Sequence, residues 1–87
     1  MSIQTAEEAR AERLVREERE RRDWFDMMQS EAAFRVFLWL LDEMGASRLM
    51  VTEDDMRMRN MADQILSRIA NADPQTYVRL MLALKNI

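Results

Sequence analysis

The chain has no cysteine and no histidine, and it has one glycine and one proline among its 87 residues. Without thiols or imidazoles it cannot form a disulfide or a zinc site with thiolate or histidine ligands. A single glycine also excludes the glycine-rich loops that bind phosphate groups. Because no histidine is available to activate a nucleophile, we expect no enzyme, no catalytic or metal-ligating residue and no cofactor.

The residues that are frequent in the chain favour helix along nearly its whole length. Alanine, leucine, methionine, glutamate and arginine all have high helix propensity, and there are 9 methionines. We therefore expect an all-α fold, with a charged N-terminal helical arm over residues 1–22 and a compact three-helix core over residues 23–87. The net charge of −3 argues against general DNA binding. The mixed charges of the N-terminus do not resemble a signal peptide.

The most apolar stretch is residues 30–45, SEAAFRVFLWLLDEMG. Every residue from 36 to 41 is apolar, so we expect this helix to be covered on all sides, within the core of one chain or within a core shared between chains, with Leu40 in the core. The run is far shorter than the about 20 residues that a membrane-spanning helix needs, so no membrane span is expected. Ser30 is suited to the N-cap, and Gly45 is suited to the left-handed position that closes the helix.

Capping signals predict where the other helices begin. Thr5 starts the first helix, because the glutamate three residues later has the spacing of a capping box. Residues 46–51 form a connection whose apolar side chains should pack. Thr52, followed by three acidic residues, starts the third helix, and those carboxylates compensate the helix dipole rather than bind a metal. Asp73 caps the last helix, with Pro74 in its first turn.

The arm is strongly charged and contains few apolar side chains. Its arginines are spaced three residues apart and wind around the helix: Arg10, Arg13, Arg16, Arg19 and Arg22. Glutamates nearly balance them, several at the i,i+4 spacing that stabilises a helix. A solvated, protruding helix is the simplest interpretation. An arm that orders on a partner protein or on nucleic acid stays open, although the carboxylates disfavour phosphate binding. The arm has no heptad repeat of apolar residues, so we do not expect a long coiled coil.

Aromatic, methionine and arginine side chains near the start of the core and in the third helix are candidates for partner binding. They are Trp24, Phe25, Met27, Met28, Arg35, Met56, Met58, Arg59 and Met61. Methionine suits adaptable contacts. The arginines are expected to pair with carboxylates or reach the surface, or else to contact another subunit. A three-helix core has one interior seam, so surplus apolar surface predicts a chain that works in several copies.

Three short blocks of the core also follow a known pattern. They are Arg35-Val36 with Leu40-Leu41-Asp42-Glu43-Met44-Gly45, then Arg59-Asn60-Met61-Ala62 with Ile65-Leu66, and finally Asp73-Pro74 with Tyr77. Together they resemble a small protein family of short-tailed phages that was first named from a Bordetella phage. The resemblance covers roughly residues 24–84 and does not include the arm. Ala33 and Ala62 stand at small-residue positions of the family, and Arg57 replaces a glycine.

The resemblance implies a phage or prophage origin. The chain would be made in the cytoplasm of the host bacterium and would reside in the virion, as a small structural or assembly component. It would dock by helix packing onto the portal, the internal ejection apparatus or another head–tail component, in multiple symmetric copies. Two alternatives stay open: a nucleic-acid-associated packaging or regulatory factor, and a scaffold-like assembly helper that is not part of the particle.

Overall fold

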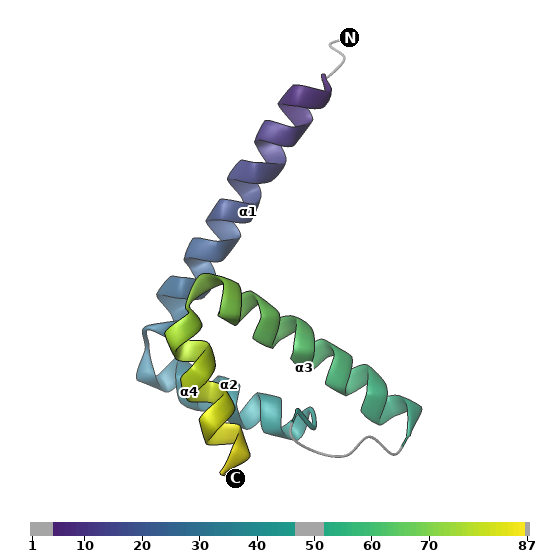
Figure 1. Ribbon diagram of the computed structural model, residues 1–87, viewed down its shortest axis with the longest axis vertical. Helices are drawn as coiled ribbons and strands as arrows, with labels where there is room; N and C mark the ends of the chain where they lie inside the picture. The colour runs from purple at the N-terminus through teal and green to yellow at the C-terminus, as the bar shows by residue number, and fades with distance from the viewer. Residues whose placement is uncertain (1–4, 47–51, 87) are drawn as a thin grey trace.

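A computed structural model describes residues 5–46 and 52–86 of the chain. Within these residues it contains four α-helices and no strand: α1 (Ala6–Met28), α2 (Glu31–Glu43), α3 (Glu53–Ala72) and α4 (Pro74–Lys85) (Figure 1). The all-α prediction is confirmed. Apart from Ala46, the predicted connection over residues 46–51 lies outside the described part of the chain.

All four helices begin at the residues that the capping signals predicted. The side-chain oxygens of Thr5, Ser30, Thr52 and Asp73 each accept a hydrogen bond from the backbone N–H three residues later. Thr5 and Thr52 form complete capping boxes, in which the acidic side chain three residues on bonds back to the cap. An N-cap of this type stabilises a helix by about 1 kcal/mol, so the starts of the helices are determined locally.

The end of α2 also follows the prediction. Gly45 has a φ of 80°, the left-handed conformation that costs glycine little. The Ala46 N–H donates to the Leu41 carbonyl at 3.1 Å, and the Gly45 N–H donates to the Asp42 carbonyl at 2.9 Å. This pair of hydrogen bonds is a Schellman motif, and it stops the helix where its apolar run ends.

The first helix continues from the arm into the core without a break. Figure 1 shows α1 projecting as a rod from the other helices, and its described side chains from residue 5 to residue 20 are exposed. In its last two turns Met28 is buried and Trp24 is half-buried. The core cluster draws on all four helices: Met28, Phe34, Leu41, Ala62, Leu66, Ile69, Leu80 and Leu84. The core therefore includes the end of α1 as well as α2, α3 and α4.

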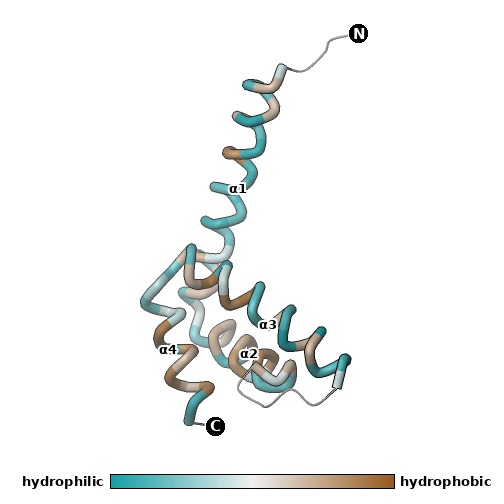
Figure 2. The backbone as a smooth tube through the Cα atoms, turned by 45° about the vertical axis from the view of Figure 1, so that its right-hand side comes forward, coloured by the Kyte–Doolittle hydropathy of each residue, from teal (hydrophilic) through white to brown (hydrophobic). Residues whose placement is uncertain are grey.

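The described helices of one chain do not cover α2 on all sides. Phe34 and Leu41 are buried, but Leu40 is only half-buried, and Val36 and Trp39 are 58% and 61% exposed. α2 packs mainly on α4 and on the end of α1, and the side that carries Val36 and Trp39 stays exposed. In Figure 2 the hydrophobic segments gather in α2, α3 and α4, whereas α1 is mostly hydrophilic.

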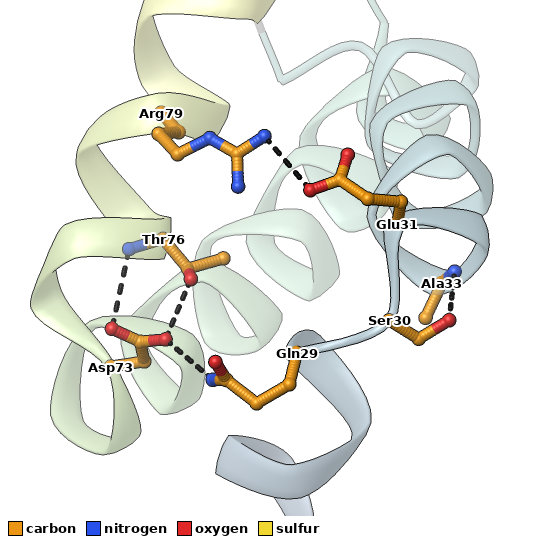
Figure 3. Close-up of polar contacts among 7 residues, drawn as sticks. All are labelled: Gln29, Ser30, Glu31, Ala33, Asp73, Thr76 and Arg79. Carbon is orange, nitrogen blue, oxygen red and sulfur yellow. Dashed lines mark hydrogen bonds and ion pairs between the residues drawn. The ribbon is translucent and has the colours of Figure 1, made fainter.

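A group of polar side chains joins the turn between α1 and α2 to the turn between α3 and α4 (Figure 3). The Gln29 Nε2 and the Thr76 hydroxyl donate to the Asp73 Oδ2 at 2.9 and 2.6 Å. The bond from the Thr76 hydroxyl, then the bond from Gln29, holds the pKa of the Asp73 carboxyl below its ordinary value. These contacts link two turns that are 44 residues apart in the sequence, so they help to set the direction of α1.

A second contact orients α2 against α4. The Arg79 guanidinium lies 4.4 Å from the centroid of the Phe34 ring and 3.4 Å from the Glu31 carboxylate. Figure 3 shows the Arg79 side chain reaching from α4 toward Glu31 at the start of α2. The aliphatic and planar parts of Arg79 thus cover a core aromatic ring while its charge stays paired near the surface.

Candidate functional site

The predicted partner residues at the end of α1 divide into buried and exposed members. Met28, also a predicted partner contact, is only 3% exposed and belongs to the core, so it is not accessible on the surface of the described chain. Trp24 is half-buried, and its ring centroid lies 5.7 Å from that of Phe37 in a tilted arrangement. Phe25 and Met27 are exposed. Trp24 and Met28 therefore attach α1 to the core, and Phe25 and Met27 remain accessible.

The predicted residues of α3 lie on the half of that helix which is remote from α1. Met56, Met58 and Met61 are exposed. Arg59 is half-buried, and its Nε lies 3.3 Å from a carboxylate oxygen of Asp63, as expected for an arginine on an apolar helix. Met58 stands one turn before a core alanine, so the apolar stripe of α3 continues beyond the part that the other helices cover.

The structure does not bring these two groups together. The Arg68 Nε lies 2.9 Å from the Glu20 carboxylate, which marks where α3 meets α1. Met58 precedes Arg68 by ten residues, or about 15 Å along a helix. Figure 1 shows the first half of α3 extending away from α1. The candidate residues thus form separate surfaces rather than one site.

An exposed stripe on α2 includes residues that the sequence analysis had assigned to the interior. Ala32, Arg35, Val36, Trp39 and Glu43 are all exposed and follow one another at helical spacing. Of these, Arg35 was a predicted partner residue, whereas Val36 and Trp39 were expected in the core. The charged residues one turn before and one turn after Trp39 were the signal that this side of α2 faces outward.

A groove on α4 is the second apolar feature that the sequence analysis did not identify. It has a volume of about 420 Å³ and is lined by Ala46, Tyr77, Val78, Met81, Leu82, Leu84 and Lys85. Val78, Met81 and Leu82 are exposed, because Leu80 and Leu84 form the core side of the same helix. The signal was the number of apolar residues in α4, which exceeds what one face of a helix can hold.

The charged side chains of the arm are exposed to solvent. The arginines at positions 10, 13, 16, 19 and 22 are all exposed. Glu18 lies 2.6 Å from Arg21 and 3.6 Å from Arg22. The hydrogen bond from Arg21 is the main reason that the pKa of Glu18 is lowered. A small cleft of about 190 Å³ lies where the base of the arm meets α3, and it is lined by Glu17, Glu20, Arg21, Trp24, Arg68 and Asn71.

The described helices show neither a membrane span nor a metal site. No helix in the described residues is long and apolar enough to cross a bilayer. Within residues 5–46 and 52–86, no three acidic side chains come together in a way that could hold a metal ion. Comparison with protein-family models, curated proteins and solved structures finds no match for this chain. The exposed helix faces are therefore the candidate binding surfaces.

Proposed function

We propose that this chain is a small structural or assembly component of a short-tailed phage particle, and that it docks onto other particle proteins by helix packing. The phage assignment follows from the resemblance of its three core blocks to the phage family. The docking mechanism follows from the exposed apolar face of α2. Portal, internal ejection apparatus and other head–tail components are the proposed partners, the virion is the proposed location, and several symmetric copies are proposed to bind.

The exposure of Trp39 is the main observation that supports docking. This side chain is 61% exposed in the middle of the most apolar stretch of the chain. A tryptophan buries about 200 Å² when it is covered, and burial contributes roughly 25 cal/mol per Å². Covering the exposed part of Trp39 would therefore contribute about 3 kcal/mol to binding.

The exposed side chains beside Trp39 are of the types that occur in protein–protein interfaces. Val36 is exposed one turn earlier on the same face, and so is Arg35. Tryptophan and arginine are enriched among the residues that contribute most to protein–protein affinity. We therefore propose that the α2 face of Arg35, Val36 and Trp39 is the surface on which a particle protein docks.

In this proposal the two parts of the chain have different roles. Residues 23–87 form a three-helix core, to which the end of α1 is added, and this core carries the docking surface. Residues 1–22 form an arm that extends from it and stays solvated until a partner covers it. The exposure of every described side chain from residue 5 to residue 20 supports this division.

The proposal is tested by mass spectrometry of purified particles from a phage that encodes this chain. Three forms are compared: the wild type, Trp39→Ala, and the control Leu82→Ala, which truncates an exposed side chain on α4. The wild type and Leu82→Ala should be present in the particles. Trp39→Ala should be reduced at least about tenfold while remaining folded by circular dichroism, because a loss of 1.4 kcal/mol is a factor of ten.

Each result that contradicts these expectations would refute a different part of the proposal. If the wild type is absent from purified particles, the chain is an assembly helper and not a virion component. If Trp39→Ala enters particles as well as the wild type, the α2 face is not the docking surface. The nucleic-acid alternative would be supported by DNA binding whose affinity falls steeply with salt concentration.

A further inference from the structure

The exposed stripe of α2 is symmetric in spacing and opposite in charge about Trp39. Arg35 lies four residues before Trp39 and Glu43 lies four residues after it, and all three side chains are exposed. Four residues turn a helix by about 400°, so each charge lies about 40° around the helix from Trp39 and about 6 Å from it along the axis. Trp39 therefore has a positive charge on one side and a negative charge at the same distance on the other.

Contacts within the chain do not explain these two charges. In residues 5–46 and 52–86, no ion pair involves Arg35 or Glu43. Glu31, one turn before Arg35, lies beside Arg79 instead. Glu43 is the last residue of α2, where a negative charge opposes the helix dipole. The stability of α2 thus does not account for the charges, whereas a partner with the opposite charges would.

A second copy of α2 presents the opposite charges when the two helices lie antiparallel with a two-fold axis at Trp39. Every position before 39 in one helix is then level with the position equally far after 39 in the other. Arg35 of each copy is level with Glu43 of the other, on the facing sides of both helices, and both side chains are long enough to meet. A parallel pair in register would instead place Arg35 beside Arg35 and Glu43 beside Glu43, and such contacts between like charges are unfavourable.

The centre of this antiparallel pair is apolar. The two Trp39 side chains meet at the axis, where offset stacking of their rings is favourable. Val36 is exposed one turn before Trp39, so it lies beside the tryptophan ring of the second copy. The end of α1 and α4 pack against α2 elsewhere and leave this face exposed. The pair would therefore remove from water the large apolar side chains that one chain leaves exposed on α2.

We propose that α2 pairs antiparallel with α2 of a second copy of this chain, with Trp39 of both copies at the two-fold axis and an Arg35–Glu43 ion pair on each side. The interface is isologous, since each copy contributes the same face. The inference rests on the proposed docking function, because it takes the α2 face as the docking surface and names a second copy as the partner there. One helix pair is smaller than a standard interface of about 1,600 Å², so we expect weak pairing that weakens further with salt.

The pairing is tested by sedimentation equilibrium of the purified full-length chain at low and high salt. Four variants are compared with the wild type: Arg35→Glu, Glu43→Arg, the double variant, and Arg10→Glu as a control. Arg10 is exposed in the projecting part of α1, away from α2 (Figure 1). Arg10→Glu makes the same change in net charge as Arg35→Glu. Circular dichroism verifies that every variant remains folded, as expected for substitutions of exposed side chains.

We expect a monomer–dimer equilibrium whose dissociation constant rises with salt concentration. Each single charge reversal on α2 should raise the dissociation constant at least about tenfold, since a like-charge contact then occurs twice in the symmetric pair. The double variant should recover affinity to within about threefold of the wild type, because the exchanged charges attract each other again. Arg10→Glu should behave as the wild type does.

Cysteine cross-linking determines the orientation, because the chain has no cysteine of its own. A mixture of Arg35→Cys and Glu43→Cys chains should be joined by a short thiol-specific cross-linker, and this mixed pair keeps one of the two ion pairs. Arg35→Cys alone should not cross-link, because eight residues, or about 12 Å along the axis, separate position 35 of the two antiparallel copies. Efficient cross-linking of Arg35→Cys alone would indicate a parallel pair and would overturn the inference.

Three results of the sedimentation experiment would also overturn the pairing. They are a wild type that stays monomeric at low salt up to about 1 mM, a double variant that fails to recover, and an Arg10→Glu variant that weakens pairing as Arg35→Glu does. The proposed docking function is judged separately, because Trp39→Ala in purified particles reports on the α2 face whatever its partner is. If pairing fails while Trp39→Ala is lost from particles, a different particle protein covers this face.

Discussion

Truncation of Leu41 should destabilise this protein more than any comparable change in α2. Leu41 is fully buried, and its backbone carbonyl accepts the Ala46 N–H in the motif that ends the helix. A buried leucine replaced by alanine costs about 2–5 kcal/mol, from lost burial and from the cavity that remains. At about 0.05–0.15 kcal/mol per residue, a chain of 87 residues has a total stability of roughly 4–13 kcal/mol. Leu41→Ala should therefore remove a large fraction of it.

The matched control is the neighbouring leucine. Leu40 is half-buried, so Leu40→Ala should cost about 1 kcal/mol, well below the cost of Leu41→Ala. Urea denaturation followed by far-ultraviolet circular dichroism measures both changes, and unchanged slopes indicate that the denatured state is comparable. Equal costs for the two variants, or a cost below about 1 kcal/mol for Leu41→Ala, would show that α2 is not oriented as the structure has it.

Two further predictions concern Asp73, which joins the α1–α2 turn to the α3–α4 turn, and the arm. The folded pKa of Asp73 lies below its unfolded value, so its contribution to stability is complete above about pH 4 and is lost as the pH falls through the folded pKa. Asp73→Asn should therefore lower the thermal midpoint at neutral pH, and its difference from the wild type should shrink at about pH 3; a constant difference would contradict this. Deletion of residues 1–22 should keep the remaining helices folded by circular dichroism and cost less than about 1 kcal/mol, because the main polar interaction that it removes is the exposed Glu20–Arg68 ion pair. An unfolded truncated chain would show that the arm belongs to the core.

The ends of the helices were determined by the sequence because the interactions that define them are local. Each N-cap, such as Thr52, bonds to a backbone group three residues away, and Gly45 adopts a conformation that few other residues tolerate. These preferences do not depend on distant parts of the chain. The all-α fold and the starts of all four helices could therefore be predicted.

Which faces are covered was decided only by the tertiary structure. The run from 36 to 41 is apolar on every side, so its own residue types do not distinguish the buried Leu41 from the exposed Trp39; only Arg35 and Glu43, outside the run, mark the exposed side. The difference arises because α4 and the end of α1 pack on one side of α2, through contacts such as Trp24 with Phe37. Similarly, the contact between Gln29 and Asp73 joins turns 44 residues apart. Such long-range packing depends on how the helices cross. The spacing of apolar residues in one helix predicts that helix, but it does not predict which neighbouring helix covers which face.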